Sequence, residues 1–294
     1  MSWVQFSIEV DGEQVEVATE AFSAAGALSV SVVDAGAEPL LEPAPGATPL
    51  WAATRVTALF ADDVDRARVE RAIQAAFPVT EPGLSVERLA DRDWSSTWRD
   101  SFHAMRFGEH LWICPVGEVP PDPQAVVVQM DPGLAFGTGT HATTALCLEW
   151  LDASPPRAET VIDYGCGSGI LGIAACKLGA SRVRAVDIDP QALTATRVNA
   201  VRNRVAPQID VLLPDQLDKQ PAHLVLANIL AGPLIELAPT LAGLVSAQGQ
   251  LLLTGILAEQ GEGVMSAYRR WFDFRPPVQR EEWVLLAGNK VAAD

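Results

Sequence analysis

The segment Val161-Ile162-Asp163-Tyr164-Gly165-Cys166-Gly167-Ser168-Gly169-Ile170 decides the fold of this 294-residue chain. Its pattern predicts a strand, then a turn that contains Gly165, Gly167 and Gly169, then a helix. Because glycine has no Cβ atom, a ligand can approach this turn closely, and the start of the helix offers unpaired N–H groups. The arrangement is typical of nucleotide-binding sheets, with a merely tight turn as the alternative.

The spacing of the glycines and a neighbouring charge indicate the kind of ligand. Glycines at every second position are one residue tighter than the GxGxxG turn of dinucleotide-binding folds. Asp163 stands two residues before the first glycine, where a carboxylate repels a pyrophosphate and attracts an ammonium group. S-adenosylmethionine, which has an amino-acid end and an adenosine end, fits both observations. The alternative is that Asp163 only hydrogen-bonds the turn.

The next predicted strand also ends in an acidic residue. Asp187 lies 22 residues after Gly165, where a carboxylate can accept hydrogen bonds from both hydroxyls of a ribose. Asp189 is the alternative for this role, but it equally suits the N-cap of the helix that Pro190 begins. We therefore expect Asp187 to bind the ribose of the cofactor.

A loop with three glycines and four threonines covers residues 131–144 and leads into a predicted helix. We expect this loop to be a flap over the cofactor, in which Phe136 covers the ligand. Thr143 or Thr144 is expected to hydrogen-bond the methionine end of the cofactor, with ordinary N-cap threonines on a linker as the alternative. His141 is a candidate base, and a solvent-facing loop histidine is an equal alternative.

A polar amide follows the apolar strand predicted over residues 224–227. Asn228 is expected at the carboxyl edge of the sheet, where ligands bind in open α/β folds, and its oxygen can accept an N–H from a bound amine. A strand-end turn is the alternative. The following Ile229-Leu230-Ala231-Gly232 supplies no ring to stack on a planar substrate, which argues against nucleobase or glutamine-amide substrates.

The rest of the chain predicts two domains and a connector. Residues 125–294 alternate strands with helices, which predicts a parallel sheet covered on both faces. Residues 1–90 have the βαββαβ order of a small ferredoxin-like α+β domain, expected to recognise a substrate, and the proline-rich residues 91–124 are expected to link the two. The strands expected in the larger domain are 125–130, 160–163, 183–187, 209–213, 224–227 and 251–254, with 283–287 as an antiparallel closing strand; the helices are 170–178, 190–203 and 233–245, the last with Pro233 in its first position.

Composition argues against several classes of protein, among them duplex-binding, metal-binding and membrane-spanning proteins. The formal net charge is −16, and residues 1–90 carry −9 of it, which disfavours binding to a nucleic acid duplex and suits a basic partner; solubility alone is the alternative. The four cysteines and four histidines lack the spacing of a metal site, so buried reduced thiols are expected. No apolar run reaches the ~20 residues of a membrane span, and the first residues do not predict a secretory signal.

Several of these segments together resemble one family, the bacterial methyltransferases of large-subunit ribosomal protein L11. The similarity extends over nearly the whole chain, and its specific motifs follow residue 130. The matching segments are Asp93-Trp94, Phe102-His103-Ala104-Met105-Arg106-Phe107-Gly108, the loop 131–144, the glycine turn 163–169, Asp187-Ile188-Asp189-Pro190, Ala227-Asn228-Ile229-Leu230-Ala231-Gly232-Pro233-Leu234 and Glu281-Glu282-Trp283.

This resemblance implies a cytoplasmic, metal-independent enzyme with the Rossmann-like, seven-stranded sheet of class I methyltransferases. It implies trimethylation of lysine side chains and of the N-terminal α-amine of L11, which the N-terminal domain would bind, with no DNA or membrane partner. By analogy, cofactor contacts fall on Phe136, Thr144, Gly165, Asp187 and Asn228.

Methyl transfer from a sulfonium is an in-line displacement, so we expect the enzyme mainly to place the reactants, with Asn228 orienting the amine and no dedicated base. The alternatives are methylation of RNA or of another protein, and a non-catalytic module that binds adenosine-type ligands.

Overall fold

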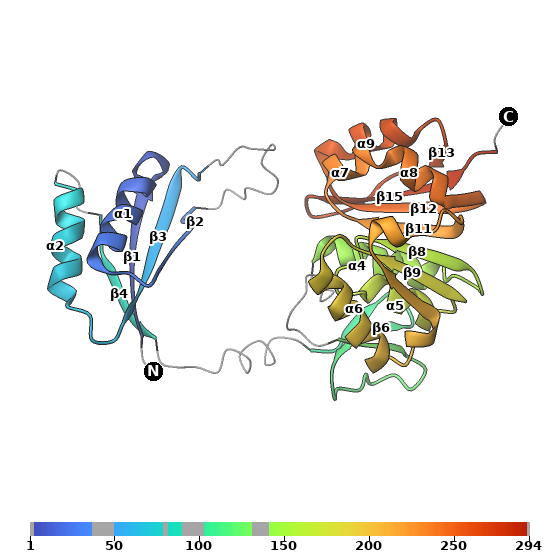
Figure 1. Ribbon diagram of the computed structural model, residues 1–294, viewed down its shortest axis with the longest axis horizontal. Coiled ribbons are helices and arrows are strands. Elements are labelled where there is room, and N and C mark those ends of the chain that lie inside the picture. The colour runs from blue at the N-terminus through green and yellow to red at the C-terminus, as the bar shows by residue number, and fades with distance from the viewer. Residues whose placement is uncertain (1–2, 37–49, 79–81, 90–102, 131–140, 293–294) are drawn as a thin grey trace. The chain divides into compact units, whose positions relative to one another are not determined.

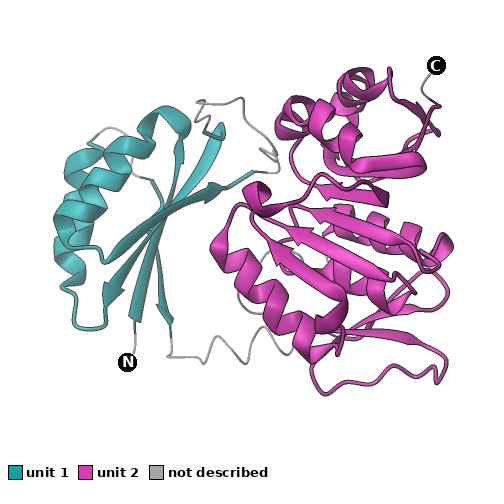
Figure 2. Ribbon diagram, turned by 45° about the vertical axis from the view of Figure 1, so that its right-hand side comes forward, with its two compact units in different colours: residues 1–96 teal, residues 97–294 magenta. Residues whose placement is uncertain are grey.

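The computed structural model describes residues 3–36, 50–78, 82–89, 103–130 and 141–292 (Figure 1). The chain divides into two compact units, residues 1–96 and residues 97–294, which Figure 2 colours separately. In the described part of the chain, no helix is both long and apolar enough to cross a membrane.

The first unit is an antiparallel sheet with two helices that share one core with it. Side chains alternate along β1, so that Val4, Phe6 and Ile8 are buried while their neighbours are partly or fully exposed. The strand order is β2-β3-β1-β4, and both helices contribute apolar residues to the core of this sheet. The elements follow the predicted βαββαβ order: β1 (Trp3–Asp11), α1 (Val15–Ala25), β2 (Ser29–Asp34), β3 (Ala53–Ala61), α2 (Arg66–Ala76) and β4 (Ser85–Leu89).

The second unit begins with a small sheet that the sequence did not predict. Its strands are β5 (Met105–Phe107), β6 (Leu111–Pro115) and β7 (Val126–Met130), in the order β5-β6-β7. The connector predicted over residues 91–124 is therefore wrong for residues 105–115, and residues 125–130 belong to this sheet rather than to the main one. Leu111 and Ile113 are fully buried and join the core of the second unit. Pro115 is the last residue of β6, so the prolines end this strand instead of interrupting it.

The main sheet is mixed, with the strand order β10-β9-β8-β11-β12-β15-β13, and β14 pairs with the first three residues of β15. Neighbouring strands from β10 to β12 are parallel, and β15 is antiparallel, as predicted for the closing strand. The order reverses between β8 and β11, which creates the switch point at which open α/β sheets bind ligands. The strands are β8 (Thr160–Tyr164), β9 (Arg182–Val186), β10 (Ile209–Leu212), β11 (Ala222–Asn228), β12 (Val245–Leu257), β13 (Phe272–Phe274), β14 (Val278–Arg280) and β15 (Trp283–Lys290).

Helices cover both faces of this sheet, as the alternating pattern predicted (Figure 1). One face packs against α4 (Ala142–Ala153), α5 (Ile170–Lys177) and α6 (Pro190–Arg202), and the other against α7 (Ala231–Glu236), α8 (Ala238–Leu244) and α9 (Gly261–Tyr268).

The single helix predicted over residues 233–245 is wrong, because the chain breaks it at Leu237 into α7 and α8. Pro239 has no N–H to continue the ladder of the first helix, and it stands in the first turn of the second one. Pro233 is accordingly the third residue of α7 and not its first. Apolar periodicity alone did not reveal this break.

Candidate active site

The glycine turn has the backbone shape that only glycine adopts without strain. Gly165, Gly167 and Gly169 have φ angles of 78°, 53° and 79°. The turn is tied to the next strand, because the N–H groups of Gly165 and Cys166 both donate to the carbonyl oxygen of Val186, at 2.8 and 3.0 Å. A Cβ atom on Gly165 would collide with the Ile229 side chain, and one on Gly169 would lie 2.8 Å from Cγ2 of Thr196. Glycine is therefore needed at these positions for the packing of the turn, and it also leaves room for a ligand to approach.

Asp187 lies directly after β9 and closes the glycine turn from the side. Its Oδ2 accepts a hydrogen bond from the N–H of Gly167 at 2.9 Å, and its Oδ1 accepts one from the N–H of Asp189 at 3.0 Å. Each carboxylate oxygen retains acceptor capacity for a further donor, such as a ribose hydroxyl. Asp189 is the N-cap of α6 and accepts from the N–H of Gln191 at 2.8 Å, so the capping role foreseen for it is confirmed.

Asp163 is buried beneath the turn, with only 1% of its surface exposed. Its Oδ2 accepts a hydrogen bond from the N–H of Gly172 at 2.8 Å, in the first turn of α5, where the N-cap Gly169 has no side chain to do so. Burial raises the pKa of this carboxyl to about 7; the Gly172 hydrogen bond opposes that rise, and the charge of Asp187 adds to it. Asp163 therefore bonds the start of α5 rather than the glycine turn itself, and a contact with the cofactor stays a prediction.

Polar residues of α6 hydrogen-bond the glycine turn, a role that the sequence pattern did not predict. The Thr196 hydroxyl donates to the carbonyl oxygen of Gly167 at 3.0 Å, and Asn199 Nδ2 donates to that of Ser168 at 2.9 Å. Both side chains are buried. The sequence could have indicated this role, because two polar residues three positions apart lie on the helix face that should pack against the sheet.

The same face of α6 also reaches the small sheet. Asn203, at the C-cap of the helix, accepts from the N–H of Gln129 and donates to its carbonyl oxygen, both at 2.8 Å. One helix thereby fixes both the glycine turn and β7.

Asn228 meets the start of α4 across 84 positions of sequence. Its Nδ2 donates to the hydroxyl of Thr144 at 3.4 Å, and Thr144 itself is buried. Thr143 faces a different partner, because its hydroxyl lies 2.7 Å from Nδ1 of His141, which also accepts from the Thr143 N–H. Of the two threonines considered, Thr144 is thus the one brought to Asn228.

His141 is the N-cap of α4, and its ring stacks edge-to-face on Trp283 with the centroids 5.0 Å apart. These contacts give it a structural role at the helix start. Phe136, the expected cover of the cofactor, lies outside the described residues.

The backbone after Asn228 packs against a glycine, Gly255, which the sequence pattern did not predict to be near the site. Gly255 has a φ angle of 82°, and a Cβ atom there would lie 2.8 Å from the carbonyl carbon of Ile229. The N–H of Ile229 donates to the carbonyl oxygen of Thr254 at 3.2 Å. Gly255 therefore lets β12 approach the chain at the point where Asn228 leaves its strand.

All four cysteines are free and buried, as expected, and burial raises the pKa of the Cys166 thiol in the glycine turn. Among the described residues, no group of three or more histidine, cysteine or acidic side chains is placed to hold a metal ion.

The sheet order, the glycine turn after β8, the acid after β9 and the amide at the end of β11 together define a class I methyltransferase. All three features lie at the carboxyl ends of neighbouring parallel strands, on either side of the switch point. The residues fit S-adenosylmethionine, because the turn is open to a close approach and carboxylates stand beside it.

Comparison with known proteins places the chain within this class. The family model described as ribosomal protein L11 methyltransferase (PrmA) matches residues 2–291, and the chain belongs to this family. Proteins named ribosomal protein L11 methyltransferase from Methylococcus capsulatus and Nitrosococcus oceani are 53% and 49% identical to it; the alignments cover 97% and 99% of this chain, and 98% and 100% of those proteins. A crystal structure of ribosomal protein L11 methylase from Lactobacillus delbrueckii subsp. bulgaricus has a TM-score of 0.58 at 33% identity, over 64% of this chain and 99% of that one. The chain is therefore a methyltransferase, and S-adenosylmethionine is its cofactor.

Proposed function

We propose that the chain transfers methyl groups from S-adenosylmethionine to amines of ribosomal protein L11, namely lysine side chains and the N-terminal α-amine, up to the trimethylated state. The observation that carries this proposal is the match over essentially the full length, both units included, to relatives named for L11. The absence of an aromatic residue in Ile229-Leu230-Ala231-Gly232 supports an aliphatic amine over a planar substrate.

In this proposal the cofactor lies along the carboxyl ends of β8 and β9. Gly165, Gly167 and Gly169 leave room for it, and Asp187 accepts hydrogen bonds from its ribose. The charge of Asp163 favours its ammonium group, and Thr144 bonds its methionine end. When bound, the cofactor supplies a methyl group on a positively charged sulfur.

Asn228 is the proposed catalytic residue. A free lysine side chain has a pKa of about 10.4, so at pH 7 it must lose a proton before it can attack, and water can accept that proton. Asn228 then orients the remaining hydrogens so that the lone pair of the nitrogen points toward the methyl group. The support for this placement is the hydrogen bond to Thr144, which fixes the amide at the switch point of the sheet.

We further propose that the first unit is a ferredoxin-like module that binds L11 in the cytoplasm, and that the chain between the units lets it present several amines to one catalytic site. The element order of the unit and its antiparallel four-stranded sheet support the ferredoxin-like assignment. The excess of acidic residues in positions 1–90 supports a basic partner.

Incubation of the chain with labelled S-adenosylmethionine and unmethylated large ribosomal subunits tests this function. A single labelled protein band that co-migrates with L11 is the expected result, and the Asn228→Ala variant serves as the control for transfer by this site. Label in RNA or in a different protein would instead support the alternative substrates, and no label at all would support the non-catalytic module.

A further inference from the structure

One crossover of the main sheet differs from the others. The chain passes from β10 to β11 through residues 213–221, which contain only a short 3-10 helix, Pro214–Gln216, and no α-helix. The start of this crossover lies beside the candidate active site, because the N–H of Asp187 donates to the carbonyl oxygen of Leu212, the last residue of β10, at 3.3 Å. Since no α-helix packs this crossover against the sheet, other contacts must fix its position.

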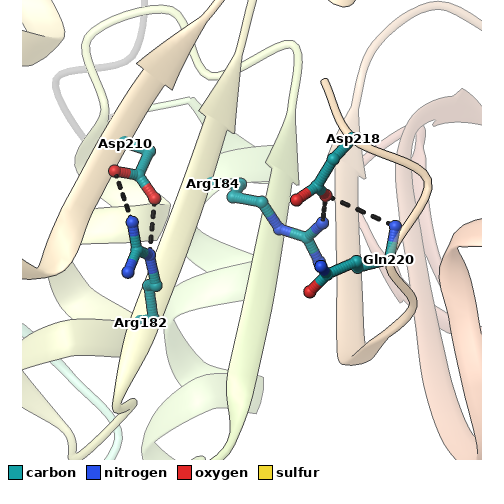
Figure 3. A network of polar contacts seen from close by, with 5 residues as sticks. All are labelled: Arg182, Arg184, Asp210, Asp218 and Gln220. Atoms are coloured by element: carbon teal, nitrogen blue, oxygen red, sulfur yellow. Dashed lines mark hydrogen bonds and ion pairs between the residues drawn. The ribbon is translucent and has the colours of Figure 1, made fainter. Parts of the chain in front are cut away.

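A mostly buried arginine, Arg184, makes one such contact with the crossover. Arg184 lies in the middle of β9, on the same face as the fully buried Val186, and its side chain is 11% exposed. Its Nη1 forms a close ion pair with Oδ1 of Asp218, which also accepts from the N–H of Gln220 at 3.3 Å (Figure 3). The guanidinium thus links the core of the sheet to the far end of the crossover.

A second arginine on the same strand makes a comparison possible. Arg182 bonds Asp210 on β10 through two hydrogen bonds of 2.6 and 3.0 Å, and the two side chains are 65% and 36% exposed (Figure 3). This pair joins two strands that are already paired by their backbones, and it is open to water, where ion pairs contribute little. Of these two ion pairs, Arg184–Asp218 is the one that connects the sheet to the crossover.

The expected direction of the cofactor along the strand ends places the start of this crossover next to its base. The glycine turn follows β8 and the proposed ribose acid follows β9, so a ligand that extends further along the strand ends places its base over the end of β10. The first residues of the crossover occupy that position. Arg184 stands three residues before Asp187, about 10 Å along the strand, so it acts on the ligand only through the crossover.

We infer that Arg184 and Asp218 form a positioning pair that holds residues 213–218 against the adenine end of the cofactor, and so sets both the affinity for the adenosine group and the preference for adenine. This inference rests on the proposed function, since it assumes that the cofactor lies along these strand ends. Neither residue takes part in methyl transfer.

The test compares Arg184→Gln and Asp218→Asn with Arg182→Gln and Asp210→Asn as matched controls from the neighbouring pair. Binding of S-adenosylhomocysteine is measured by calorimetry, and kcat and KM for S-adenosylmethionine are measured with L11 as substrate. We expect Kd and KM to rise about tenfold in the first two variants while kcat stays within about twofold, and the two controls to match the parent chain.

A second measurement separates positioning from a general loss of stability. S-inosylhomocysteine, which carries hypoxanthine in place of adenine, reports on the preference for the base. The ratio of its Kd to that of S-adenosylhomocysteine is expected to fall in Arg184→Gln and Asp218→Asn and to stay constant in the controls, whereas Arg184→Lys restores part of the preference. Because the Asp218 side chain is 55% exposed, its variant is expected to fold even where Arg184→Gln does not.

A folded Asp218→Asn variant with unchanged Kd and unchanged base preference would overturn the inference, as would a loss confined to kcat. If the parent chain itself failed to bind S-adenosylhomocysteine, the proposed function would fail and the inference with it. Binding of S-adenosylhomocysteine to the parent chain therefore separates a failure of the proposed function from a failure of this inference.

Discussion

Replacing the buried Asp163 by asparagine is expected to stabilise the second unit and to weaken cofactor binding at the same time. Asparagine has nearly the same shape, and its side-chain oxygen can accept the hydrogen bond that Asp163 takes from Gly172. The substitution therefore removes the charge and leaves the packing intact. Buried ionised carboxylates destabilise a fold, and those kept at binding sites exchange stability for function.

The magnitude follows from the raised pKa of Asp163. Burial moves this pKa from 3.8 to about 7 in the folded chain, a difference that corresponds to about 4 kcal/mol. Because the folded state holds its proton up to a higher pH than the unfolded state, this residue makes the free energy of unfolding fall as the pH rises from about 4 to about 7. The variant lacks this dependence, so its advantage over the parent is small near pH 4 and approaches about 4 kcal/mol at pH 8.

Urea denaturation at several pH values between 4 and 8, followed by fluorescence and circular dichroism together, measures this difference. Asp189→Asn is the matched control, because asparagine also serves as an N-cap and the site is exposed; its effect is expected to stay within about 0.5 kcal/mol at every pH. Calorimetry with S-adenosylmethionine is expected to show weaker binding to the Asp163 variant. A variant less stable than the parent at pH 8, or a difference that does not change with pH, would show that the buried charge of Asp163 does not destabilise the fold.

Three further substitutions test other parts of the site. Asn228→Ala is expected to lower kcat about 100-fold and to affect cofactor affinity much less, as steady-state kinetics and calorimetry would show; full turnover would exclude the orienting role. Asp187→Ala is expected to raise the Kd of S-adenosylhomocysteine about 10- to 100-fold, because hydrogen bonds to a charged group are lost, and an unchanged Kd would remove it from the ribose site. Gly255→Ala is expected to destabilise the chain by about 2 kcal/mol or more in thermal unfolding, since its Cβ would press on the backbone of Ile229. The control is Gly243→Ala, where a Cβ atom meets nothing within 4 Å; equal melting temperatures for the two variants would contradict the steric account.

The parts of the site that the sequence predicted are those whose chemistry is local. The glycine turn is contained in a few consecutive residues, and its backbone angles follow from the residue type. Asp187 and Asn228 could be placed because each directly follows or ends an apolar strand, and parallel strands bring their carboxyl ends to one edge of the sheet.

The parts that the sequence did not predict depend on partners far away in the chain. Nothing near Thr144 indicates that its hydroxyl meets Asn228, and nothing near Gly255 indicates that another segment crosses it. Arg184 interrupts the apolar pattern of β9, and its partner Asp218 lies 34 positions later, in the crossover after β10. Residues 105–115 were mistaken for a connector because the prolines near them outweighed two short strands.

The activity proposed for this chain is methyl transfer to amines of ribosomal protein L11. Mass spectrometry of purified, unmethylated L11 after incubation with the chain and S-adenosylmethionine tests it most directly. We expect mass increments of whole methyl groups, up to three on a modified amine, located by peptide mapping at lysines and at the N-terminus. Unmodified L11 in the presence of a chain that binds the cofactor would contradict it.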